Sequence, residues 1–450
     1  MITRRRFIKQ AGVTGAGLLF AGPFLGKPIV ASSGTVICIG AGLAGMAAAY
    51  KLKQAGYKVI VLESRNRVGG RVFSHQVTNR LVIELGGEWI GNSHTRMQEL
   101  CSRFGLELVN NQLETHLVYK GDYFPAGKWD YSASWKKKWK EMIAGYSQLG
   151  DEDKQQLDKY DWWRYLVNNG CEGRDLEIRE LLDSTDFGES IRHVSAFAAL
   201  AEYAESSEKN EMDLKIKGGN QMLAEKFADA IGRESILLQH TVIKIDQKEK
   251  VTVSCSNGKV FTADRMICTL PTFALSKIQW QPGLPPEKTN AINELQYARI
   301  NKHAVVFKER FWKDEAFDLI SDETPHYFYH ATKGQPGTEG VLISYTIGDK
   351  AAVMANGSNV ANASAIAQTL APCFGNIQPL IRQQVNYYWG TDAISQGAYA
   401  LFGINQWFRL RSVLAKPFLH THFAGEHLAD WQGFMEGAVN TGEDAAGQII

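Results

Sequence analysis

The sequence lacks the features that mark several large classes of protein. Its 49 Lys and Arg residues nearly balance 48 Asp and Glu residues, so no basic excess points to nucleic acid or an anionic membrane as a partner. The six cysteines form no CxxC motif and no Cys/His cluster, so no metal site is expected and no disulfide pairing can be derived from spacing. Internal repeats and low-complexity tracts are also absent. The composition therefore indicates a large globular protein, and its 450 residues are enough for two or more domains.

The N-terminal segment has no apolar run long enough for a stable membrane span. Glycines, Pro23 and Lys27 interrupt the weakly apolar stretch between residues 11 and 30. Before that stretch, residues 3–9 read TRRRFIK, with paired arginines ahead of an aromatic and an aliphatic residue, and small residues follow it. This pattern is typical of a twin-arginine export signal. We therefore expect residues 1–32 to be a signal peptide and the mature protein to be periplasmic or secreted, in preference to a retained N-terminal anchor.

The stretch from Thr35 to Glu63 contains the order strand, glycine turn, helix, strand, acid. Gly40 permits the tight turn, Gly42 lets a pyrophosphate approach the backbone, and Gly45 lets the helix pack closely on the strand. The helix N-terminus supplies N–H groups and a partial positive charge for phosphates. Glu63 follows the second strand, where its carboxylate can accept hydrogen bonds from ribose hydroxyls. The sequence therefore predicts a dinucleotide site, for NAD or FAD.

Further glycine-rich motifs follow in a characteristic order. Residues 63–71 read ESRNRVGGR, residues 84–91 read ELGGEWIG, and the C-terminal part contains FAGE at 423–426 and WQGFMEGAVNTG at 431–442. This order resembles the flavin-containing amine oxidase superfamily, which includes monoamine oxidases, polyamine oxidases and L-amino-acid oxidases. The resemblance covers essentially the whole chain after the N-terminal segment, and it selects FAD over NAD.

The resemblance implies an α/β fold in which a Rossmann-like FAD-binding domain of the GR2 type is interleaved with an α+β substrate-binding domain. We expect the FAD-binding domain to comprise residues 33–93, 216–285 and 395–450, and the substrate-binding domain residues 94–215 and 286–394. Residues 94–210 are predicted to be mostly helical, and a helix is expected from Met222 to Ile231.

The residues that the resemblance assigns to the cofactor share the glycine-rich turns and the closing C-terminal segment. They are Gly40, Gly42, Gly45, Glu63, Arg65, Gly70, Arg71, Gly86, Gly87, Glu88, Trp89, Val242, Trp389, Gly425, Glu426, Phe434, Met435 and Ala438. In the covalent monoamine oxidases the residue before the active-site tyrosine is a cysteine joined to the flavin, whereas this chain has Ala398 there. FAD is therefore expected to be bound non-covalently.

Four residues are expected to carry the chemistry. Lys302 resembles the family lysine that holds a water near the flavin, where a cation stabilises the negative charge that builds on O2. Tyr399 and Phe434 are expected to form the two walls of an aromatic cage that orients the amine, and Trp89 suits an apolar or aromatic substrate. Either His94, Glu88 or water could deprotonate the substrate ammonium.

The implied function is FAD-dependent oxidation of a primary amine or an L-amino acid to an imine, with O2 reduced to hydrogen peroxide. A substrate carboxylate would need a cationic partner. This chain has Gly87-Glu88-Trp89 where the amino-acid oxidases place an arginine, so Arg96, Arg299 or His330 would have to supply the cation. Three alternatives remain: a periplasmic amine or alkaloid dehydrogenase that passes electrons to a carrier protein, a flavin-dependent desaturase or protoporphyrinogen-type oxidase that shares the glycine motifs, and an exported FAD-binding subunit. A homodimer is expected at the level of the family only.

Overall fold

The computed structural model describes residues 34–205, 212–430 and 432–450, which belong to one compact unit. The predicted export signal, residues 1–32, lies outside the described residues.

A five-stranded parallel sheet holds the glycine turn. Its strand order is β22-β13-β1-β2-β9. The strands are β1 (Thr35–Ile39), β2 (Lys58–Leu62), β9 (Ile236–Leu237), β13 (Arg265–Cys268) and β22 (Thr421–Phe423). β1 lies in the middle with parallel neighbours on both sides, and its residues 36–39 are almost completely buried, which explains their uninterrupted apolar sequence.

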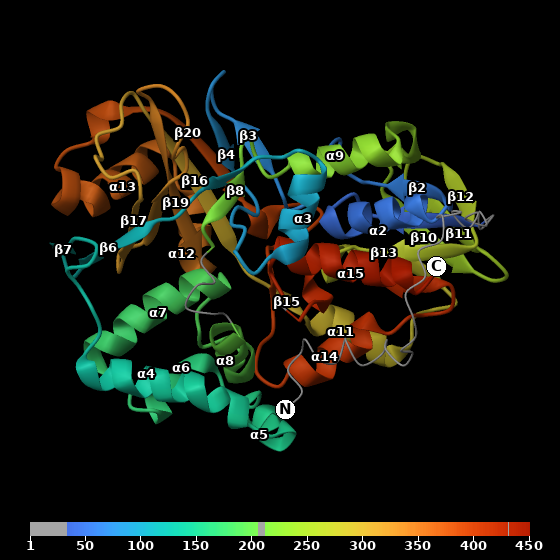
Figure 1. Ribbon diagram of the computed structural model, residues 1–450, viewed down its shortest axis with the longest axis horizontal. Helices are drawn as coiled ribbons and strands as arrows, with labels where there is room; N and C mark the ends of the chain where they lie inside the picture. The colour runs from blue at the N-terminus through green and yellow to red at the C-terminus, as the bar shows by residue number, and fades with distance from the viewer. Residues whose placement is uncertain (1–33, 206–211, 431) are drawn as a thin grey trace, which may run out of the picture. The chain divides into compact units, whose positions relative to one another are not determined.

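Two helices pack tightly against each other beside this sheet, α2 (Leu43–Gln54) and α15 (Met435–Gly447). They run side by side in Figure 1, and a Cβ on Gly442 would lie 2.1 Å from the Ala44 carbonyl oxygen. The alanines of α2 permit this approach because they carry no bulk beyond Cβ. The C-terminal segment is thereby brought to the glycine turn at the start of α2. A third helix, α9 (Met222–Ile231), also packs on α2 and matches the predicted helix.

The opposite face of the parallel sheet is covered by a four-stranded sheet of order β12-β11-β10-β14. Its strands are β10 (Val242–Gln247), β11 (Val251–Cys255), β12 (Val260–Ala263) and β14 (Gln279–Gln281). Buried side chains of β10 and β11 contact those of β1, so a continuous apolar core lies between the two sheets.

A seven-stranded sheet of order β20-β16-β19-β18-β17-β6-β7 forms the second large part of the molecule. It comprises β6 (Glu114–Tyr119), β7 (Asp122–Phe124), β16 (Ile300–Phe307), β17 (Phe317–Ser321), β18 (Tyr327–His330), β19 (Gly340–Ile347) and β20 (Ile381–Tyr388). Every residue of β16 and β19 is buried. Their antiparallel register places Lys302 opposite Tyr345.

The remaining helices complete the fold, and Figure 1 shows α4 to α8 grouped together. They are α3 (Thr95–Arg103), α4 (Ala133–Gly145), α5 (Asp151–Leu157), α6 (Trp162–Asn168), α7 (Gly173–Phe187), α8 (Ala196–Glu205), α10 (Thr272–Leu275), α11 (Pro286–Glu294), α12 (Gly348–Asn356), α13 (Asn359–Phe374) and α14 (Trp407–Ala415). Short strand pairs are β3 (Ser74–Gln76) with β4 (Val82–Glu84), β5 (Leu108–Asn110) with β8 (Leu214–Ile216), and β15 (Gln296–Tyr297) with β21 (Ala400–Leu401).

The prediction that residues 94–210 are mostly helical is wrong for one part of this range. Residues 108–124 form β5, β6 and β7 rather than helix. The physical reason is long-range pairing, because β6 lies parallel to β17, with Leu117 opposite Ile320. A local sequence pattern contains no information about a partner two hundred residues away.

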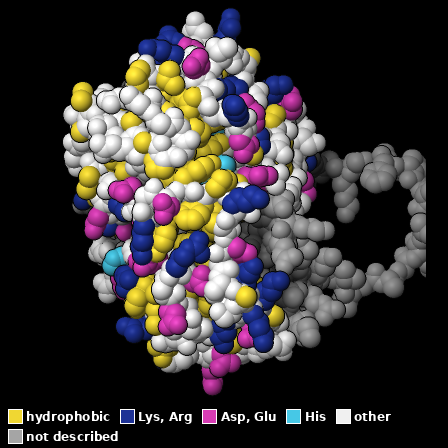
Figure 2. All heavy atoms as spheres, turned by 90° about the vertical axis from the view of Figure 1, so that its left-hand side faces the viewer, with side chains coloured by type: hydrophobic (Ala, Val, Ile, Leu, Met, Phe, Trp, Pro, Cys, Tyr) yellow, Lys and Arg dark blue, Asp and Glu magenta, His cyan; other side chains and the backbone are white. Residues whose placement is uncertain are grey.

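All six cysteines lie in described residues, and each is a free thiol. Cys38 and Cys268 are buried in strands. No helix in the described ranges is long and apolar enough to cross a membrane. On the face in Figure 2, lysines and arginines are interspersed with acidic residues.

Candidate active site

A cavity of about 290 Å³ opens at the carboxyl ends of β1 and β2. Its wall includes the glycine turn, the loop at residues 63–72, the start of β10 and the segment from Gly425 to Ala438. These pieces come from distant parts of the sequence, and the crossovers of the parallel sheet bring them together at one edge. Ligands of open α/β sheets bind at this edge.

The three fingerprint glycines have different surroundings. Gly40 has a φ of +99°, and a Cβ there would lie 2.7 Å from the Thr269 hydroxyl. A Cβ on Gly45 would lie 1.9 Å from the Gly40 carbonyl oxygen, so this glycine permits helix-to-strand packing and does not line the cavity. Gly42 lines the cavity, and a Cβ there would have no described atom within 4 Å.

The start of α2 is suited to a phosphate. Gly42 is its N-cap residue, and no side chain accepts from the N–H groups of the first turn. Leu43 and Ala44 of that turn line the cavity. An uncapped helix N-terminus beside open space is a site for an anion such as a pyrophosphate.

Buried carboxylates and arginines lie at the two ends of this cavity. Glu63 is buried, and its Oε2 accepts a hydrogen bond from the Ala41 N–H at 2.7 Å. Arg65 lines the cavity, but its guanidinium donates to Asp392 at 2.6 Å, so its charge is paired within the protein.

At the other end, Arg71 Nη1 lies 2.5 Å from Glu426 Oε1, and Glu426 Oε2 accepts from the Gly433 N–H at 2.8 Å. Burial favours a higher pKa for Glu426, but the positive charge of Arg71 and these hydrogen bonds lower the pKa overall, so Glu426 is ionised. The ionised acid fixes the loop that carries Phe434.

These features fit FAD. The open space at Gly42 accommodates the pyrophosphate, Glu63 lies beside the expected ribose, and Val242 and Ala438 line the same cavity. Ala398 lines this cavity and has no nucleophilic atom, so it fits a non-covalent cofactor.

A second cavity of about 510 Å³ adjoins the first. The residues that line both cavities are Arg71, Gly87, Ala398, Tyr399, Gly433, Phe434 and Met435. These shared residues mark the place where the two cavities meet.

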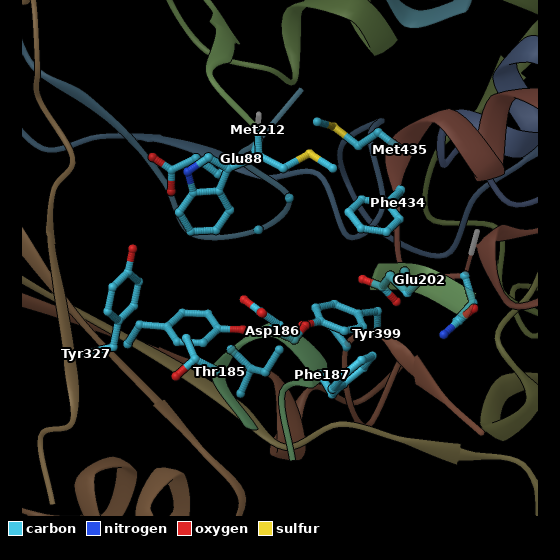
Figure 3. Close-up of a pocket in the computed structure, with 18 of the residues that line it drawn as sticks. Glu88, Thr185, Asp186, Phe187, Glu202, Met212, Tyr327, Tyr399, Phe434 and Met435 are labelled. Atoms are coloured by element: carbon cyan, nitrogen blue, oxygen red, sulfur yellow. The ribbon is translucent and has the colours of Figure 1, made fainter. Parts of the chain in front are cut away.

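The predicted aromatic residues lie around the second cavity. Phe434 and Tyr399 occupy opposite sides of it in Figure 3. The Tyr399 hydroxyl donates to the Asp186 carbonyl oxygen, and His94 contacts the Phe434 ring at 5.4 Å between centroids. Trp89 lines the cavity as well. The arrangement leaves a space between two aromatic walls, and their role as a cage for the amine stays a prediction.

Lys302 is buried at the wall of this cavity and its charge is paired. Its Nζ donates to the carbonyl oxygens of Glu84 at 3.1 Å and Gly86 at 2.8 Å, and to Glu88 Oε2 at 3.1 Å. The Tyr329 hydroxyl donates to the same Glu88 oxygen at 2.5 Å. An ammonium has three N–H donors, so these contacts use all of them.

The structure also bears on the proposed proton acceptors. Burial lowers the pKa of His94 to about 4, so it is neutral, and it is not among the residues that line either cavity. Glu88 lines the larger cavity but is engaged by Lys302 and Tyr329.

Most of the predicted cofactor residues line the smaller cavity. Those that line only the larger one are Gly86, Glu88, Trp89 and Trp389, and Gly45 lines neither. Trp389 is buried, and its indole N–H donates to the Leu85 carbonyl oxygen at 2.7 Å, which supports the second glycine turn from behind.

Sequence reasoning missed the contribution of the helical region to the larger cavity. Thr185, Asp186 and Phe187 from the end of α7, with Glu202 and Tyr203 from α8, line it. Each acid lies near a helix end, in STDFG at 184–188 and in ALAEYA at 199–204, and nothing in these local sequences distinguishes it from a solvent-exposed helix position.

The fold and the two adjoining cavities define a class, a dinucleotide-binding oxidoreductase in which the cofactor faces an enclosed aromatic substrate cavity. Comparison with known proteins specifies the family. The family model described as flavin containing amine oxidoreductase matches residues 43–450. The chain belongs to this family and uses FAD.

Individual relatives agree with this assignment. The chain is 27% identical to amine oxidase [flavin-containing] B of Homo sapiens, over 92% of this chain and 86% of that protein. Its fold is similar to that of putrescine oxidase bound to putrescine, with a TM-score of 0.84 and 24% identity, covering 93% of this chain and 99% of the other. Cyclohexylamine oxidase from Brevibacterium oxydans gives a TM-score of 0.83 and 23% identity, with 93% and 98% covered.

Proposed function

We propose that the chain oxidises primary amines rather than L-amino acids, and that O2 accepts the electrons to give hydrogen peroxide. When bound, FAD accepts a hydride from the carbon that carries the amine. The protein's own contribution is to bind the amine between Tyr399 and Phe434, to orient it and to exclude water. The names of the similar putrescine and cyclohexylamine oxidases support an amine substrate.

The observation that carries this proposal is the pairing of cations in the substrate cavity. Among its described lining residues, the cations are Arg71 and Lys302, and they are bound to Glu426 and Glu88. A buried substrate carboxylate needs a cation whose charge is not already balanced by another acid. The cavity therefore suits an amine better than an amino acid.

The cations suggested from sequence lie elsewhere. Arg96 pairs with Glu443, Arg299 pairs with Glu189, and His330 is buried against Trp312. None of the three is among the residues that line the larger cavity. Because of this placement, Arg96, Arg299 and His330 are not in a position to bind a substrate carboxylate in the larger cavity.

A substrate panel tests the proposal. Purified flavoprotein is incubated in air with primary amines, polyamines and the common L-amino acids, and hydrogen peroxide is measured. We expect peroxide with amines and none with amino acids. Efficient turnover of an L-amino acid would contradict the proposal.

A carrier-linked amine dehydrogenase is the second candidate, and the contacts of Lys302 favour it. A cation that assists O2 reduction acts best when its charge is not neutralised, whereas Lys302 is paired with Glu88 at 3.1 Å. Under this alternative, amines reduce the flavin without oxygen present but yield little peroxide in air. A soluble electron acceptor such as a quinone or a dye then restores turnover.

We further propose that the protein is exported by the twin-arginine route, because the sequence TRRRFIK precedes a weakly apolar segment. Replacing Arg5 and Arg6 by lysine would retain the flavoprotein in the cytoplasm. Cell fractionation of the parent and the variant measures this directly. Equal export of both would contradict the proposal.

A further inference from the structure

Two carboxylates in the substrate cavity have no role in the function proposed above. Asp186 lies in the last turn of α7 and Glu202 lies on α8, and both line the larger cavity. Figure 3 shows both beside Tyr399, one wall of the aromatic space. Burial raises the pKa of Tyr399, and the charges of Tyr345, Glu202 and Asp186 add to this effect, which indicates that the carboxylates and the tyrosine are close neighbours.

Neither acid forms an ion pair with a described lysine or arginine, and the charge of Arg179 opposes the raised pKa of Asp186 only in part. The Tyr203 hydroxyl donates to Asp186 Oδ2 at 2.8 Å, but this contact supplies no charge. The nearby Arg179 is bound to Asp183 at 2.9 Å. Glu202 has no hydrogen-bond or ion-pair partner among the described residues, and the surface it exposes lines the cavity.

Two unneutralised carboxyl groups in an enclosed site are energetically unfavourable when ionised. Burial raises the pKa of Asp186 to about 7, with a further contribution from Asp183. Burial likewise raises the pKa of Glu202 to about 8, with a further contribution from Asp186. A positively charged ligand removes this cost, because it balances the negative charge of the ionised carboxylates. Charge-assisted hydrogen bonds then stabilise the bound ligand.

The cavity has room for such a ligand. Its volume of about 510 Å³ extends from Phe434 and Tyr399 past Asp186 to Tyr327. An amine placed between the aromatic walls therefore leaves space for a chain that carries a second charged group.

We propose that Asp186 and Glu202 bind a second ammonium group of the substrate, so that the enzyme is selective for diamines over monoamines of the same length. This inference rests on the proposed oxidation of primary amines. The acid pair binds the ammonium group that does not react. The aromatic walls bind the amine that is oxidised.

The parent enzyme provides the first test, with putrescine (1,4-diaminobutane), 1-aminobutane and 4-amino-1-butanol compared under air. We expect kcat/KM for putrescine to exceed that for the other two by at least about tenfold, since a charge-assisted hydrogen bond contributes this much. If 1-aminobutane is oxidised as efficiently as putrescine, the amine oxidase function stands and the diamine subsite is refuted. If no amine reduces the flavin, the proposed function itself fails.

Substitutions provide the second test. In Glu202→Gln and Asp186→Asn we expect kcat/KM for putrescine to fall about 10- to 100-fold, mainly through KM, and that for 1-aminobutane to change less than about threefold. Glu205→Gln is the matched control, because it makes the same change on α8 at a residue that does not line the cavity. Each variant is checked for its FAD absorbance before it is assayed.

The outcomes separate two roles for the acids. An equal fall for both substrates, with a shifted pH profile of kcat, would show that Glu202 acts on the reacting amine and would overturn the diamine subsite. An unchanged kcat/KM for putrescine in both Glu202→Gln and Asp186→Asn would also overturn the diamine subsite.

Discussion

Gly42 and Gly45 belong to the same turn of the fingerprint, but the structure gives them separable roles. A Cβ on Gly42 meets no described atom within 4 Å and projects into the cofactor cavity. A Cβ on Gly45 would lie 1.9 Å from the Gly40 carbonyl oxygen, which is backbone and cannot move aside cheaply. The same substitution, glycine to alanine, therefore gives two different defects.

Gly42→Ala is expected to fold normally and to bind FAD weakly. The added methyl group occupies the space assigned to the pyrophosphate, and the loss of one charge-assisted hydrogen bond corresponds to an affinity about 10- to 100-fold lower. Equilibrium dialysis measures the FAD dissociation constant, and far-UV circular dichroism checks the fold. Excess FAD should restore the activity of this variant.

Gly45→Ala is expected to lose stability instead. Overpacking of a well-packed site costs about 1–3 kcal/mol, and a contact this short with backbone lies at or beyond the upper end of that range. The urea midpoint should fall, and excess FAD should not restore it fully. Unchanged FAD affinity in Gly42→Ala, or parental stability in Gly45→Ala, would refute this division of roles.

Further predictions concern other residues of the two cavities. Lys302→Met leaves the Glu88 carboxylate buried without its cation, so the free energy of unfolding in urea should fall by about 3–5 kcal/mol. Adding Glu88→Gln should recover part of this free energy, and an unchanged free energy of unfolding in Lys302→Met would contradict the pairing. Burial raises the pKa of Asp318 from 3.8 to about 7, so this group contributes stability at low pH that is lost as the pH rises through about 7. Asp318→Asn should abolish this loss, which amounts to at most about 4 kcal/mol, and parallel pH profiles of stability for variant and parent would contradict it. Acid precipitation should release all FAD into the supernatant, because Ala398 offers no nucleophile, and flavin retained by the pellet would contradict this.

The fingerprint was predictable because its signals are local. The apolar run of β1, the glycines and the acid after β2 lie within one continuous stretch, Thr35 to Glu63, and their spacing reflects short-range geometry. The helix α9 was predicted with its correct bounds for the same reason, since its apolar residues repeat with helical spacing.

The substrate cavity could not be predicted to the same extent. Asp186 and Glu202 look like exposed helix positions in the sequence, and they face a cavity only because α7 and α8 pack below Tyr399, which lies about two hundred residues further along the chain. The strands at residues 108–124 depend on pairing with β17. The ion pair of Lys302 with Glu88 likewise requires the approach of β16 to the second glycine turn. These features arise from topology and not from local pattern.

An anaerobic titration of the enzyme-bound flavin with putrescine tests the central claim most directly. The flavin absorbance is recorded after each addition, and air is admitted at the end. We expect complete bleaching at one equivalent of putrescine per flavin and the return of the oxidised spectrum in air. An unchanged spectrum with putrescine and with a panel of other primary amines, or bleaching by L-amino acids alone, would contradict it.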